Sequence, residues 1–136
     1  MLRPYRGFME DKMSLAVGIL LIIVGLGMIL FWARHMATGG LPQGIRTLES
    51  GGYIAFHITI ELTTGTLCIL GGLGLALAVS CGAPVALFAS GMLAYTGVNS
   101  LAWKEVKSKP ALSAMFIVPT LIAIISGVYL IAFVLT

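Results

Sequence analysis

The chain has 136 residues, of which 59% are hydrophobic and only 10% are charged. A soluble domain normally carries about 25% charged residues, so this composition excludes a soluble globular protein and is typical of a membrane protein. The net charge is +3, and its Lys and Arg residues lie at the N-terminus and in the connections, without the clustered basic face that nucleic-acid binding requires. The length fits one membrane domain over residues 1–136.

Four apolar runs follow one another along the chain, at about residues 13–32, 53–79, 85–103 and 111–135. Each has the roughly 20 residues that a helix needs to cross a bilayer. None alternates with the period of two that barrel strands show. The sequence therefore predicts an all-α fold, a bundle of four transmembrane helices in up-down-up-down antiparallel order, with both termini on one side.

The first run, residues 13–32, is too long for the core of a signal peptide and has no small-residue cleavage pattern after it, so it is interpreted as a permanent span. Trp32 and Trp103 are expected in the aromatic belt of one interface. The positively charged residues leave the orientation in the membrane undecided. The count of Lys and Arg over the whole chain and the count around the first helix favour opposite orientations. We expect an integral protein of a prokaryotic cell membrane.

The second run carries His57 and Glu61, the most informative residues of the chain. Ionisable side chains inside a membrane span are costly, and they usually face the interior of the bundle and mark a functional site. Four residues apart on a helix, the two share one face and can touch. A protonated Glu61 bonded to His57, Tyr95 or Asn99 would be tolerated there and could exchange its proton. His57 is predicted to be neutral, because a positive charge would oppose the dipole of the helix N-terminus.

The same face of the second run continues with polar and then small residues, which predicts close helix packing, because small residues let backbones approach in a membrane. Potential partners lie on the first and the last run. The residues expected to pack the helices are Gly25, Gly65, Cys68, Gly72 and Gly127.

A rise of 1.5 Å per residue gives the depth of each residue along the antiparallel helices. At this rise, polar side chains from three runs are expected in one layer. This layer predicts a pocket for a substrate or a proton, open toward the side of the basic connections. Its expected residues are His57, Glu61, Thr64, Tyr95, Asn99 and Thr120. Pro119 removes one intrahelical hydrogen bond at the same depth.

No motif of a known catalytic or nucleotide-binding type occurs, so we expect no catalytic residue and no enzyme activity. Two neighbouring ligands, His57 and Glu61, are too few for a zinc site. Haem or a quinone beside His57 remains an alternative as cofactor, although none is expected.

The leading hypothesis is a small proton-linked transporter of a small molecule or ion, with Glu61 as the carboxylate that carries the proton. A bundle of this size rarely encloses a wide path by itself, so a homo-oligomer in the lipid bilayer is expected. The alternatives are a non-catalytic accessory or structural subunit of a larger membrane complex and a redox subunit that binds quinone or haem.

Overall fold

The computed structural model describes residues 6–39, 51–102 and 107–134, with side chains over 12–39, 55–102 and 107–132. Over these ranges every regular element is a helix, which confirms the predicted all-α bundle. Its elements are α1 (Arg6–Ala37), α2 (Gly51–Ala76), α3 (Gly82–Leu101), α5 (Pro110–Tyr129) and a short π-helix, η2 (Leu130–Val134), that continues α5. The prediction for Trp103 lies outside the described residues.

The end of α2 departs from the predicted boundary at Val79, and local hydrogen bonding explains the difference. Ala78 adopts a positive φ of 52°. The N–H of Val79 donates to the carbonyl of Gly74 at 2.8 Å, and the N–H of Ala78 donates to that of Leu75 at 3.2 Å. This pattern is the Schellman motif that terminates helices. Hydropathy cannot locate this end, because the residues after Ala76 remain apolar.

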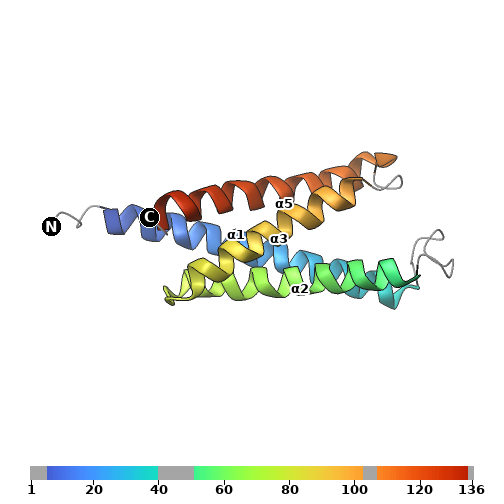
Figure 1. Cartoon of the computed structure of the whole chain (residues 1–136), viewed down its shortest axis with the longest axis horizontal. Coiled ribbons are helices and arrows are strands. Elements are labelled where there is room, and N and C mark those ends of the chain that lie inside the picture. Colours follow the sequence, from blue (N-terminus) through green and yellow to red (C-terminus); the bar gives the residue numbers. More distant parts are fainter. Residues whose placement is uncertain (1–5, 40–50, 103–106, 135–136) are drawn as a thin grey trace.

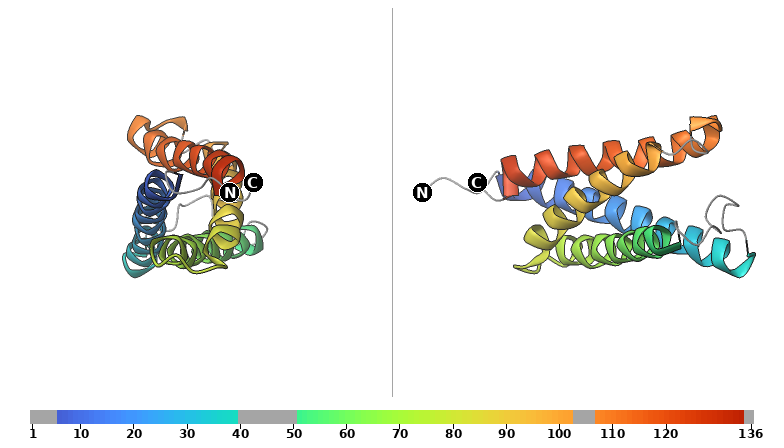
Figure 2. Two further views of the ribbon diagram at one scale, coloured as in Figure 1. Left: turned by 90° about the vertical axis from the view of Figure 1, so that its left-hand side faces the viewer. Right: turned by 45° about the vertical axis from the view of Figure 1, so that its right-hand side comes forward.

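The helices lie side by side in the order α1, α2, α3, α5, and α1 makes few contacts with α5. Figures 1 and 2 show that α1 and α3 lie on opposite sides of the bundle and that each runs diagonally between α2 and α5. The start of α1 and the end of η2 lie at one end of the bundle, together with the turn from α2 to α3. This arrangement is the expected up-down-up-down order.

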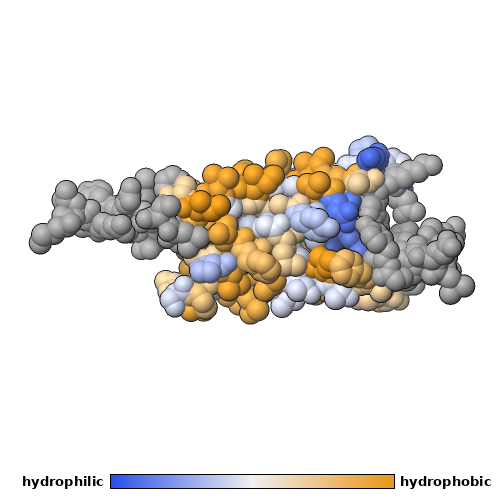
Figure 3. All heavy atoms as spheres, viewed as in Figure 1, coloured by the Kyte–Doolittle hydropathy of each residue, from blue (hydrophilic) through white to orange (hydrophobic). Residues whose placement is uncertain are grey.

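Three helical segments among the described residues are long and apolar enough to cross a membrane, namely Lys12–Ala37, Ala55–Ala76 and Pro110–Ala132. These segments place the protein in a membrane. The third helix, α3, is not one of them, because small and polar residues such as Gly91, Thr96 and Asn99 dilute its apolar ones. Apolar side chains cover much of the face in Figure 3, and hydrophilic ones gather toward the end where α3 finishes.

Pairs of facing glycines hold α1 against α2. A Cβ added to Gly25 would lie 2.5 Å from the carbonyl oxygen of Gly65. A Cβ added to Gly72 would lie even closer to the carbonyl oxygen of Gly18. Cys68 is fully buried between the two pairs. The predicted packing stripe of α2 therefore lies against α1 of the same chain. Gly127 differs, since a Cβ there would lie 3.9 Å from the nearest atom, an ordinary contact with Ser90.

Candidate functional site

The site begins with two buried side chains on one face of α2. His57 and Glu61 are 5% and 3% exposed, and the Nε2 atom of His57 lies 3.0 Å from Oε1 of Glu61. The one-turn spacing in a regular helix produces this contact. The carboxyl group of Glu61 is thus removed from the surface, and its first partner comes from its own helix.

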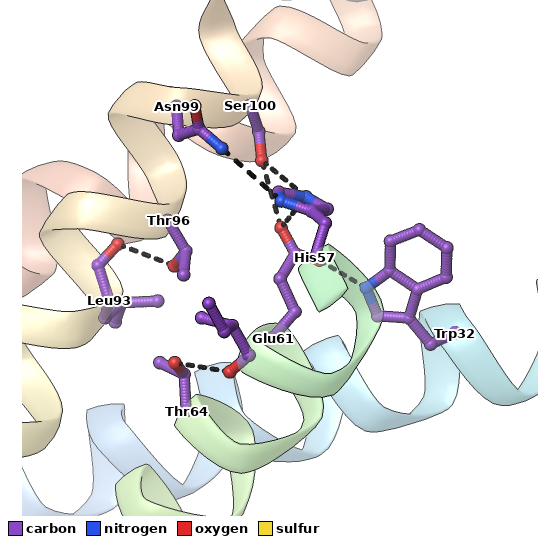
Figure 4. A network of polar contacts seen from close by, with 9 residues as sticks. Trp32, His57, Glu61, Thr64, Leu93, Thr96, Asn99 and Ser100 are labelled. Carbon is purple, nitrogen blue, oxygen red and sulfur yellow. Dashed lines mark hydrogen bonds and ion pairs between the residues drawn. The ribbon is translucent and has the colours of Figure 1, made fainter. Parts of the chain in front are cut away.

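Two neighbouring helices supply the other contacts of Glu61. The indole N–H of Trp32, on α1, donates to Oε2, and the hydroxyl of Ser100, on α3, donates to Oε1 at 3.0 Å. Figure 4 shows Trp32 and Ser100 on opposite sides of the carboxyl group. Both are buried, at 4% and 1% exposed. Polar groups from three helices therefore meet at a single carboxyl group, which satisfies polar atoms that hydrocarbon would leave unpaired.

Asn99 extends the network on the far side of the imidazole ring. Its Nδ2 atom lies 3.4 Å from Nδ1 of His57. When Nδ2 donates to Nδ1, the imidazole is neutral and its proton lies on Nε2, facing Glu61. When Nδ1 carries a proton instead, the Asn99 amide can turn and accept it, since an amide group has both a donor and an acceptor. The network can therefore hold one proton more or one fewer without leaving a ring nitrogen unpaired.

A cavity of about 250 Å³ lies beside the carboxyl group. Glu61 and Thr96 are polar members of its wall, and the rest is almost entirely apolar. All four helices contribute, and α1 and α5 supply most of the lining, namely Val24, Gly27, Met28, Phe31, Met115, Phe116 and Pro119, with Leu93 and Gly97 from α3. The cavity thus occupies the region where α1 and α5 make few contacts.

The other residues predicted for the pocket have different positions. Thr64 is buried but donates within its own helix, to the carbonyl of Ile60 at 2.8 Å. Thr120 likewise donates to the carbonyl of Phe116 at 2.7 Å, beside Gly97. Tyr95 does not join the site, because its side chain points outward and is 64% exposed. The depth of Tyr95 and Asn99 along α3 follows from the sequence. The sequence could not give the rotation of α3 about its axis, which decides whether each of these side chains reaches the site.

Sequence reasoning missed Trp32 and Ser100 as partners of Glu61. The expectation of an interfacial Trp32 side chain is wrong, since it is buried against Glu61. A signal was present, because Trp32 follows Gly18 and Gly25 at seven-residue steps and so continues the face that packs on α2. Ser100 likewise follows Leu93 by seven residues on the buried face of α3.

Metal chemistry finds little support in this geometry. Over the described part of the chain, no three side chains of His, Cys, Asp or Glu come together. Within that part of the chain, His57 and Glu61 form a contacting pair of ionisable side chains on α2.

Replacing Ser100 with alanine is expected to destabilise the bundle by about 1–3 kcal/mol, because Glu61 loses a buried donor. The matched substitution Tyr95→Phe removes a hydroxyl from the outward face of the same helix and should change stability by less than about 0.5 kcal/mol. Reversible unfolding in mixed micelles measures both. Equal effects would mean that the Ser100 hydroxyl contributes nothing to the network.

A protein-family model described as a domain of unknown function (DUF8058) matches residues 11–135. No curated protein matches the chain, and neither does any solved structure. The match covers α1 from residue 11 onward, the whole of α2, α3 and α5, and every residue of the site described above.

Proposed function

Because the chain belongs to the DUF8058 family, whose description names no activity, we propose its function from the site: a small proton-linked membrane transporter. Glu61, together with His57, binds and releases the proton, and the adjoining cavity binds the transported molecule. The proposed setting is a prokaryotic cell membrane, and the proposed working unit is an oligomer.

The observation that carries this proposal is a buried carboxyl group on the wall of a cavity inside a membrane bundle. Within the described residues no Lys or Arg side chain contacts Glu61, so no fixed positive charge neutralises it. A structural role would be served at lower cost by an apolar residue, since buried charge is expensive in a membrane. The presence of an acid at this position therefore supports proton exchange.

The local geometry gives the proton two neighbouring positions. In one, the imidazole Nε2–H donates to Oε1 of Glu61; in the other, the carboxyl group holds the proton and Nε2 accepts it. Trp32 and Ser100 donate to the carboxyl group. The amide of Asn99 can donate to Nδ1 of the ring or, after turning, accept a hydrogen bond from it. Proton gain and loss then need only a change of tautomer and a turn of one amide.

Replacing Glu61 with glutamine tests the proposal. Glutamine keeps the shape of the side chain, and its amide can accept from Trp32 and donate to Ser100, so the bundle should fold. Infrared difference spectra between low and high pH are expected to show a titrating buried carboxyl group in the natural protein and none in Glu61→Gln. Proteoliposomes containing a pH-sensitive dye should show solute-driven proton movement that the substitution abolishes, with gradients of amines, carboxylates, sugars and amino acids as probes.

Two outcomes would contradict this function. Identical infrared spectra for both proteins would mean that Glu61 does not exchange a proton. A titrating Glu61 without proton movement under any of the four solute gradients would instead favour a subunit of a larger complex. Protein-free liposomes control for amines that cross the bilayer unaided.

A further inference from the structure

The polar atoms on the wall of the cavity are hydrogen-bond acceptors. An ionised carboxylate has about four acceptor positions, and Glu61 receives three donors, from Trp32, Ser100 and His57. One position therefore remains for a ligand. The hydroxyl of Thr96 donates to the carbonyl of Leu93 at 3.1 Å. Toward the cavity, this hydroxyl therefore acts as a hydrogen-bond acceptor.

A proline adds a further acceptor on the side of α5. Pro119 lies inside this helix and has no N–H group, so the carbonyl of Met115 lacks its regular intrahelical donor. Met115 and Pro119 both line the cavity. No Lys or Arg occurs among the lining residues that the structure describes. With Glu61 ionised, the site thus suits a ligand that donates hydrogen bonds, and it disfavours carboxylates, phosphates and quinones, whose oxygens only accept.

We propose that this cavity binds the ammonium form of a primary amine with a small apolar body. The ammonium group donates to Glu61 and to the acceptors of Thr96 and Met115, and the apolar body contacts side chains such as Phe31 and Phe116. A volume of about 250 Å³ equals the share of roughly eight water molecules in the liquid, which limits the body to about one ring. This inference rests on the proposed function for its link to proton transport.

Charge balance connects amine binding to proton release. In the described residues, the titratable group that faces Glu61 is His57, while α1 and α3 present the neutral groups of Trp32, Ser100 and Asn99, and α5 presents no charge to the cavity. An ammonium ion beside Glu61 compensates the carboxylate as a proton does. One positive charge thus replaces the other, so that binding of the amine releases a proton from the pair.

The cavity can be filled without touching the proton site. A Cβ added to Gly27, which lines the cavity, meets no atom within 4 Å, and the same holds for Gly91 on α3, outside the lining. Gly27→Leu is therefore expected to occupy the space of the apolar body, and Gly91→Leu adds the same side chain elsewhere. Neither residue contacts Glu61.

Calorimetry on protein in lipid nanodiscs tests the proposal, with benzylamine as the probe at a pH where it is protonated. We expect binding with proton release in the natural protein and in Gly91→Leu, and at least tenfold weaker binding in Gly27→Leu. Benzyltrimethylammonium, which keeps the charge but has no N–H donor, and benzoate should both bind at least tenfold more weakly than benzylamine.

Three results would overturn the inference: no benzylamine binding by the natural protein, equal binding by Gly27→Leu and Gly91→Leu, or equal affinity for one of the two analogues. The infrared titration of Glu61 is measured on the same samples. A titrating Glu61 without amine selectivity refutes the ligand class alone, whereas a silent Glu61 refutes the proposed function as well.

Discussion

Replacing Gly25 with valine is expected to disrupt the packing of α1 on α2. Even a single Cβ at this position would lie 2.5 Å from the carbonyl oxygen of Gly65 and 3.1 Å from the Cβ of Cys68. Backbone atoms cannot move aside as flexible side chains can, so the helices must separate. Overpacking usually costs about 1–3 kcal/mol, and a contact with backbone should reach or exceed the upper end. Reversible unfolding in mixed micelles measures the loss.

Gly27→Val is the matched control, because Gly27 lies on the same helix and an added Cβ would meet nothing within 4 Å. The control should keep the stability of the natural protein to within about 1 kcal/mol, the size of ordinary helix-propensity differences. Equal losses for the two substitutions would mean that the close approach of Gly25 to Gly65 does not exist. A stable Gly25→Val protein would lead to the same conclusion.

Replacing Trp32 with phenylalanine is expected to give the second large effect, because it removes the indole N–H that binds Oε2 of Glu61. The ring centroid of Trp32 lies 6.3 Å from that of His57, and phenylalanine keeps a smaller aromatic ring at this position. An unsatisfied buried acceptor costs about 1–3 kcal/mol, and more when it is charged. The free energy of unfolding should fall by at least this amount, and the infrared band of Glu61 should shift.

A double-mutant cycle separates the hydrogen bond from the loss of ring volume. In a Glu61→Leu background, Trp32→Phe removes a donor that no longer has a partner, so the same change should cost only the lost ring volume and destabilise the protein less than it does beside Glu61. The coupling energy between the two positions should then fall in the range of about 0.5–3 kcal/mol found for contacting residues. A coupling of zero would contradict the bond between Trp32 and Glu61.

The internal position of the α1–α2 glycines changes how the small-residue stripe is understood. On sequence alone, Gly65 and Gly72 are equally suited to contacts within one chain and between copies. In the structure they face Gly25 and Gly18 of the same chain. The proposed oligomer would therefore use other surfaces, such as the outward apolar faces of α1 and α5, where side chains including Ile23 and Ile125 are more than half exposed.

The sequence by itself determined the membrane class, the four helices and the contact between His57 and Glu61. These features depend on local composition and on the fixed geometry of a helix: hydropathy over about 20 residues reports a span, and a four-residue spacing places two side chains together. The burial of Cys68 and the close approach of Gly65 and Gly72 follow from the same periodicity. The predicted positions of helix ends were less accurate, because the Schellman motif at Ala78 ends α2 inside an apolar run.

Only the tertiary structure decided which residues of other helices meet Glu61. The rotation of a helix about its axis depends on the fit of all its side chains against its neighbours, so depth along the chain leaves it undetermined. That rotation turns Ser100 inward and Tyr95 outward on α3, and it brings Trp32 from α1 to the carboxyl group. The cavity also depends on the arrangement of all four helices, in which α1 and α5 make few contacts, and no single segment specifies that arrangement.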